Sequence, residues 1–174
     1  GEGSGLLGRE TSTLDEPIRT DLITNTTIAR YYFRKSFHYD GPPTNGIRLR
    51  MFLDDGAIVY LNGEEIYRVN MPDGPIAFDT LAADGVSNAE AEDISLPKVN
   101  LVQGQNVFAV GVHQDRLGSS DVVFGLGLEA IVVETPGRQG IDYQPIDEEW
   151  IELFNRSDVP VAVSYTHLTL PTTS

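Results

Sequence analysis

The stretch that decides the fold is LRMFLDDGAIVYLNGEEIYRVN, residues 49–70. Leu49, Met51 and Leu53 alternate with Arg50 and Phe52, which is the period of a strand with one buried face. Asp-Asp-Gly at 54–56 interrupts the pattern with residue types that accept a sharp reversal. Asn-Gly at 62–63 favours a type I′ hairpin turn, because both central residues of that turn need a positive φ. The stretch therefore predicts three strands joined by two tight turns.

The same two-residue period recurs along the chain as far as residue 134. Further strands are predicted at 29–37, 94–96, 106–114 and 121–133. Residues 1–28 are typical of an irregular lead-in, and residues 71–93 are typical of a long acidic loop. No segment carries apolar residues at helical spacing for three turns. The predicted fold is an all-β antiparallel jelly-roll sandwich over residues 29–134.

The composition excludes several classes of function. The chain has 174 residues, with 12 Lys and Arg against 26 Asp and Glu, a net charge of −14, and no cysteine. A nucleic-acid or anionic membrane surface would require clustered basic residues, so neither partner is expected. Without cysteine the chain has no disulfide, thiol nucleophile or thiolate metal site. No apolar run approaches the roughly 20 residues that a transmembrane helix needs, so membrane insertion is not expected.

Four segments together resemble one known module. They are YYFRKSF, DDGAIVYLNG, NVFAVGVHQ and FGLGLEAIV, at 31–37, 54–63, 106–114 and 124–132. In sequence and order they are similar to the galactose-binding-like jelly-roll module of large secreted bacterial proteins. The resemblance implies a noncatalytic accessory or binding module of a secreted or cell-surface multidomain protein, whose partner is carbohydrate or a neighbouring domain of the same polypeptide. It leaves open a structural spacer or docking domain beside a catalytic hydrolase domain.

A second resemblance begins after a linker rich in Gly and Pro at 135–140. IDEEWIELFNRSDVPVAV, residues 146–163, is similar to the opening of a lamin-tail-type domain, which is an immunoglobulin-like sandwich. We therefore expect an incomplete second domain over 141–162, with too few strands to bury a core. VSYTHLTLPTT resembles the translation of a sequencing adapter, so residues 163–174 are predicted to be an artefact. Gly1, in place of an initiator Met, predicts an internal fragment.

Catalytic chemistry is not expected. His113 ends a predicted strand, and Ser119 and Asp121 follow it, which invites comparison with a Ser-His-Asp triad. A nucleophilic serine of this kind lies on a strained turn such as G-x-S-x-G, and the sequence contains no such motif. We therefore predict that His113 is a hydrogen-bonded structural residue and that the chain is not an enzyme.

Seven residues are candidates for contact with carbohydrate, because they combine aromatic rings with groups that hydrogen-bond hydroxyls. They are Tyr60, Asn62, Tyr67, Arg68, Asn70, His113 and Gln114. Four aspartates are candidates for structural calcium, since Ca²⁺ takes carboxylate oxygens on irregular loops. They are Asp54, Asp55, Asp73 and Asp79. The alternative for the first two is that turn aspartates bond their own backbone; no other cofactor is expected.

Overall fold

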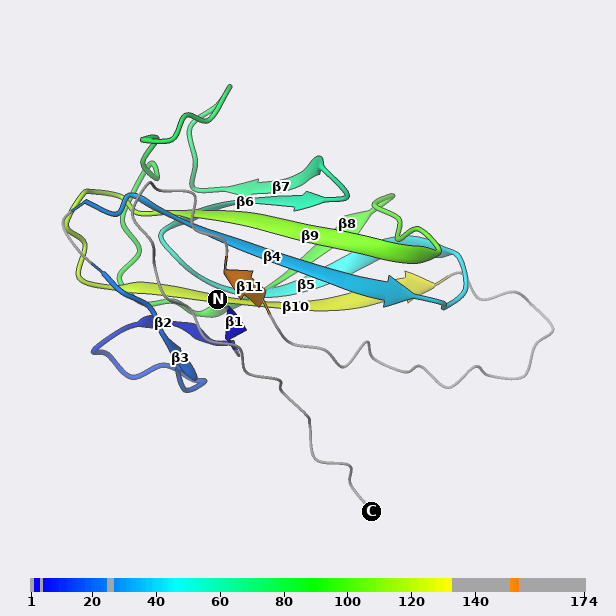
Figure 1. Ribbon diagram of the computed structural model, residues 1–174, viewed down its shortest axis with the longest axis horizontal. Helices are drawn as coiled ribbons and strands as arrows, with labels where there is room; N and C mark the ends of the chain where they lie inside the picture. Colours follow the sequence, from blue (N-terminus) through cyan, green and yellow to red (C-terminus); the bar gives the residue numbers. More distant parts are fainter. Residues whose placement is uncertain (1, 4, 25–26, 133–150, 154–174) are drawn as a thin grey trace, which may run out of the picture.

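A computed structural model describes residues 2–3, 5–24, 27–132 and 151–153 (Figure 1). These residues form strands and turns and contain no helix. The described part of the chain therefore has no helix that is long and apolar enough to cross a membrane. Two sheets pack as the layers of a sandwich, which confirms the predicted all-β antiparallel fold.

Sheet A has six strands and sheet B has five. In spatial order, sheet A contains β1 (Glu2–Gly3), β11 (Ile151–Leu153), β4 (Arg30–Tyr39), β9 (Gly104–His113), β6 (Gly56–Leu61) and β7 (Glu64–Val69). Sheet B contains β3 (Thr20–Asp21), β2 (Leu7–Arg9), β10 (Val122–Val132), β5 (Thr44–Asp54) and β8 (Ala91–Pro97). Neighbouring strands are antiparallel, except that β2 and β3 are parallel.

Alternation along the long strands places the core between the two sheets. Tyr31, Phe33 and Phe37 of β4 are buried, whereas the intervening Arg34 is exposed. The rings of Phe33 in β4 and Phe124 in β10 meet across the sandwich, with their centroids 4.5 Å apart. The buried residues of β4 alternate with exposed ones, as the two-residue period predicted for the strand at 29–37 requires.

The predicted hairpin between β6 and β7 is confirmed. The two strands pair antiparallel, and the turn residues Asn62 and Gly63 have φ angles of 53° and 88°. Positive φ at both central positions is what a type I′ turn requires.

The prediction of a second tight turn at 54–56 is wrong. Residues 54–56 do not join two strands of one sheet, because β5 belongs to sheet B and β6 to sheet A. Asp54 and Asp55 are buried, 3% and 4% exposed, and do not form a reversal at the surface. Asp and Gly are common wherever the chain changes direction. They occur both in a hairpin turn and where the chain passes from one sheet to the other, so their presence alone does not distinguish the two.

Two segments that the sequence suggested to be irregular contribute strands. Residues 1–28 contain β1, β2 and β3, and Leu7 of β2 is fully buried in the core. β8 begins at Ala91, so the loop that precedes it ends at residue 90. Strands of two or three residues are too short to show a two-residue period, which is why the sequence pattern did not reveal them.

Most of the predicted C-terminal organisation lies outside the described residues. This applies to the linker at 135–140, to the adapter-like residues 163–174, and to the second domain at 141–162 apart from β11. The backbone of β11 pairs with β4 on one side and with β1 on the other. The domain boundaries in this part of the chain stay predictions.

Candidate functional site

Three carboxylates from distant parts of the sequence meet at one end of sheet B. Glu10 follows β2, Asp54 ends β5, and Asp121 directly precedes β10. β10 pairs with β2 on one side and with β5 on the other, so the strand register brings these three positions together. One oxygen from each carboxylate lies within 4.8 Å of the other two. We call Glu10, Asp54 and Asp121 the carboxylate cluster.

Asp54 is the buried member of the carboxylate cluster, at 3% exposed. Burial raises the pKa of its carboxyl group, since the charged form is poorly solvated. The hydrogen bond with Asp55 and the negative charges of Asp55, Asp121 and Glu10 raise this pKa further. At neutral pH the Asp54 carboxyl group therefore keeps its proton unless a cation lies beside it.

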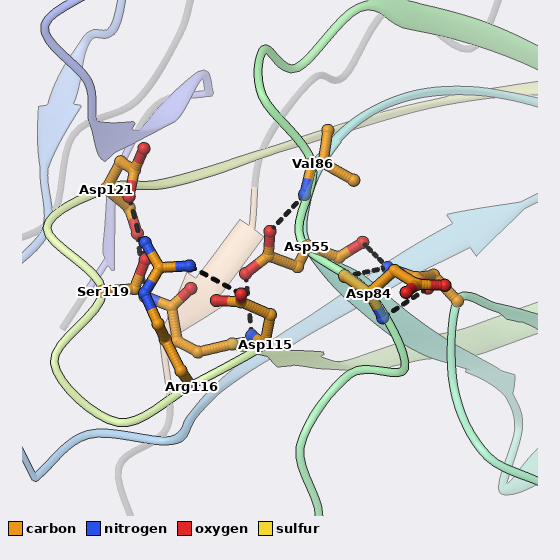
Figure 2. Close-up of polar contacts among 9 residues, drawn as sticks. Asp55, Asp84, Val86, Asp115, Arg116, Ser119 and Asp121 are labelled. Carbon is orange, nitrogen blue, oxygen red and sulfur yellow. Dashed lines mark hydrogen bonds and ion pairs between the residues drawn. The ribbon is translucent and has the colours of Figure 1, made fainter.

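Asp55 uses both of its carboxylate oxygens to hold its own chain together (Figure 2). Oδ1 accepts the N–H of Val86 at 2.7 Å, and Oδ2 accepts the N–H of Asp115 at 2.8 Å. Its backbone oxygen accepts a bond from Asn70 Nδ2 at 3.0 Å. Asp55 thus ties the loop between β7 and β8, and the chain after β9, to the end of β5. Both donors are distant in sequence, so the Asp55 carboxylate does not bond the backbone of its own turn, which was the alternative that the sequence suggested.

A second candidate site is the face of sheet A that points away from sheet B, which we call the outer face. Strand register places two rows of residues across β4, β9, β6 and β7. The rows are Tyr32, Gly111, Ile58 and Arg68, then Arg34, Ala109, Tyr60 and Glu65. In these rows β9 carries small residues, and aromatic or guanidinium groups lie on the flanking strands at Tyr32, Arg34 and Tyr60. Ile58 of the first row is buried, at 1% exposed.

Arg30, at the start of β4, contacts two aromatic rings on the outer face. Its guanidinium carbon lies 4.1 Å from the ring centroid of Tyr32 and 5.0 Å from that of Phe78. Nη1 donates to the carbonyl oxygen of Ala77 at 3.2 Å, which fixes the loop that carries Phe78. The Phe78 side chain stays 64% exposed. We call Arg30, Tyr32 and Phe78 the aromatic cluster.

Comparison with known proteins leaves the family of the chain open. No protein-family model matches the chain, and no curated protein matches it. Among solved structures, it is similar to the crystal structure of Streptomyces avermitilis alpha-L-rhamnosidase complexed with L-rhamnose, with a TM-score of 0.47 and 16% sequence identity. The match covers 75% of this chain and 11% of that chain, so this chain spans about a tenth of that protein's length. The function proposed below rests on the geometry of the chain itself.

Three of the seven candidates for carbohydrate contact use their polar groups in hydrogen bonds within the chain. Arg68 donates from Nε and Nη2 to the carboxylate of Glu65, each at 2.8 Å, and from Nη1 to two carbonyls of the following loop. Asn70 donates to the backbone oxygens of Asp55 and Asp84. Asn62 Oδ1 accepts the N–H of the residue at 107, on β9, at 2.8 Å. These contacts fasten the hairpin and the loop after it.

The two candidates at the end of β9 are buried. His113 and Gln114 are each 1% exposed. His113 Nδ1 lies 2.7 Å from the carbonyl oxygen of Thr80, to which it can donate. Gln114 Nε2 donates to the carbonyl oxygen of Asp121 at 2.8 Å. His113 is therefore buried and hydrogen-bonded, as the sequence analysis predicted.

The remaining candidates lie on different surfaces. Tyr60 belongs to the outer face, whereas Tyr67 packs against the core. Asp73 and Asp79 are exposed on the loop between β7 and β8, and the acidic groups that could share a metal in the described chain do not include them. The structure therefore does not gather the seven candidates in one place. Whether any of them touches a ligand stays a prediction.

Sequence reasoning missed five of the six residues that define the two sites: Glu10, Asp121, Arg30, Tyr32 and Phe78. Glu10 and Asp121 join Asp54 only through the pairing of β10, and no spacing along the chain could indicate that. Arg30 and Phe78 meet because the loop after β7 reaches β4. The sequence predicted the strand at 29–37, which carries Arg30 and Tyr32, but it gave no sign that the loop with Phe78 lies beside it.

Proposed function

We propose that the chain is a noncatalytic, galactose-binding-like module that binds carbohydrate through the outer face of sheet A. The aromatic cluster is the observation that carries the proposal. Aromatic rings offer apolar surface to the C–H groups of a sugar ring, and a guanidinium group donates hydrogen bonds to its hydroxyls. Arg30, Tyr32 and Phe78 bring these two kinds of group within 5.0 Å of each other on one surface.

The neighbouring row extends the same surface. Arg34 is exposed, and Tyr60 lies two strands away on the same face, with Ala109 between them. Both residues add hydrogen-bonding groups beside the aromatic cluster. Phe78 is 64% exposed beside Arg30, so its ring is accessible to a ligand on this surface.

A noncatalytic role is supported by the surroundings of the histidine at the end of β9. His113 is buried, and its Nδ1 faces the backbone carbonyl of Thr80, so it is not positioned to take a proton from a serine hydroxyl at the surface. We propose further that the module belongs to a secreted or cell-surface multidomain bacterial protein. This part of the proposal follows from the sequence resemblance at 31–37, 54–63, 106–114 and 124–132.

A glycan array probed with the full chain, followed by calorimetry with any glycan that binds, tests the proposal. Phe78→Ala and Arg30→Lys should each weaken binding by about tenfold, since contacts at the centre of an interface typically contribute at that level. Leu117→Ala is the matched control, because Leu117 is also exposed, at 60%, but follows β9. Absence of any bound glycan at millimolar concentration would refute the proposal and favour a spacer or docking domain.

A further inference from the structure

Buried oxygens without hydrogen-bond donors gather at the end of the sandwich that holds the carboxylate cluster. Within the described chain, Glu10 Oε2, Gln114 Oε1 and Asp115 Oδ1 are buried and have no hydrogen-bond partner. Buried polar atoms in folded proteins are normally paired with a donor or with ordered solvent. Asp115 already pairs with Arg116 through Oδ2. The unpaired oxygens of Glu10 and Gln114 therefore indicate a positively charged or donating group that belongs beside them.

Gln114 provides evidence that does not depend on the acidic residues. Its side chain is 1% exposed, and its Nε2 donates to the backbone oxygen of Asp121 at 2.8 Å. The amide group thus lies against the segment that carries one member of the carboxylate cluster, and its oxygen is left unpaired. An amide oxygen is a ligand that Ca²⁺ accepts in proteins.

The carboxylate of Asp54 lacks donors as well. Among the described residues, no N–H group donates to it, and its hydrogen-bond contact is the carboxyl group of Asp55. Both oxygens of Asp55 already accept backbone N–H groups. A carboxyl group that is 3% exposed and meets only other carboxylates can ionise only if a cation compensates its charge.

No basic side chain supplies that charge in the described structure. None of the ion pairs formed there by Lys or Arg includes Glu10, Asp54 or Asp121. Arg116 lies at this end of the molecule (Figure 2), but it pairs with Asp115 at 2.6 Å.

We propose that the carboxylate cluster, Glu10, Asp54 and Asp121, binds one Ca²⁺ ion. Every available ligand is an oxygen, which selects a hard cation over zinc or copper. The three carboxylates come from separate segments and form an irregular set. Ca²⁺ tolerates irregular coordination, whereas Mg²⁺ demands nearly ideal octahedral geometry.

A bound ion would connect the segment after β2 to the ends of β5 and β10. It would therefore hold the N-terminal part of the chain on sheet B and stabilise the folded state. The cluster shares no residue with the aromatic cluster of the outer face, so calcium binding and carbohydrate binding can fail separately.

Calorimetric titration and thermal unfolding of the full chain, after treatment with a chelator, test the proposal with CaCl₂ as the probe. We expect one ion to bind with a Kd of roughly 10⁻⁴–10⁻³ M, as in extracellular calcium modules. At about ten times that concentration, Tm should rise by roughly 5 °C. Glu10→Gln and Asp121→Asn should each weaken binding by at least about tenfold, because each removes a charged ligand and keeps the side-chain size.

Asp93→Asn is the matched control, because Asp93 is an exposed carboxylate that pairs with Arg50 at 3.6 Å outside the cluster. It should leave the calcium response unchanged. Circular dichroism establishes that each variant folds, and Asp54→Asn replaces any variant that does not. The proposal is overturned if the wild-type chain shows no heat of binding and no rise in Tm. It is equally overturned if Mg²⁺ or NaCl at equal ionic strength gives the same rise, or if the cluster variants respond like Asp93→Asn.

Discussion

At the scale of single residues, buried polar side chains hold the irregular parts of this sandwich. Asn106 is fully buried, and its Nδ2 donates to the carbonyl oxygens of Val102 and Gly104. Its Oδ1 accepts the N–H of Val102 and the Nδ2 of Asn62, each at 3.0 Å. One amide thus joins the turn before β9 to the hairpin turn after β6. Asn62 and Asn106 thus hydrogen-bond two turns to each other. The sequence had suggested instead that Asn62 contacts a carbohydrate ligand.

His113 makes stability depend on pH. Burial lowers its pKa below the ordinary 6.5, the positive charge of Arg30 lowers it further, and the hydrogen bond to Thr80 acts in the opposite direction. The folded state therefore binds a proton at His113 less readily than the unfolded state. The neutral histidine contributes stability that is fully present above pH 6.5, and this contribution is lost as the pH falls from 6.5 through the lowered pKa of the folded state.

Urea unfolding between about pH 7.5 and 5.5 measures this effect as the difference between wild type and His113→Gln. The wild-type free energy of unfolding should fall more steeply towards acid than that of the variant, by at most about 1.4 kcal/mol per pH unit. His38→Gln is the control, since His38 is exposed. Parallel curves for wild type and His113→Gln would show that the two states of the protein protonate His113 equally.

At the scale of elements, local sequence was enough to predict strands and one turn, but not how elements meet. The Asn-Gly pair at 62–63 specifies its turn because the required φ values are local to two residues. Asp-Asp-Gly at 54–56 was assigned the wrong role. Burial by segments distant in sequence decides whether such residues form a hairpin turn or connect two different sheets. The carboxylate cluster was only partly predictable for the same reason. Asp54 was a candidate from its sequence, whereas Glu10 and Asp121 become its neighbours through strand register.

The hairpin between β6 and β7 should depend on Gly63 through its backbone alone. Gly63 has a φ of 88°, and a Cβ atom there would meet no atom within 4 Å. Gly63→Ala should therefore lower the free energy of unfolding by about 1 kcal/mol, because a residue with a Cβ atom is strained at this φ. Denaturant unfolding measures the change, with the exposed neighbour substitution Glu64→Ala as the control. Equal stability of the two variants would contradict the strain argument.

At the scale of the whole molecule, the two proposed sites occupy separate parts of one sandwich. The chain carries a net charge of −14, yet guanidinium groups stand on the outer face at Arg30 and Arg34. Carboxylates gather instead where β2, β5 and β10 end. A cation at the carboxylate cluster would neutralise part of the charge that opposes compact packing there, and would leave the outer face free for a ligand.

Deleting residues 141–174 should have little effect on this sandwich. The deletion removes β11, which pairs with β4 at two positions and with β1 at two. β4 keeps its pairing with β9 along all ten of its residues, and this pairing carries Phe33 and Tyr31 into the core. We therefore expect the melting temperature to change by a few degrees, which corresponds to roughly 1 kcal/mol or less.

Deletion of residues 1–10 is the informative comparison, because it removes a short terminal segment that enters the core. Leu6 and Leu7 are 6% and 0% exposed, and β2 lies beside β10 in sheet B. Loss of a buried leucine side chain typically costs about 2–5 kcal/mol, so this deletion should lower stability severely. Differential scanning calorimetry of both truncated chains measures the contrast. A drop of tens of degrees on deletion of residues 141–174 would mean that the fold does not end near residue 134, and that β11 is an integral strand of sheet A.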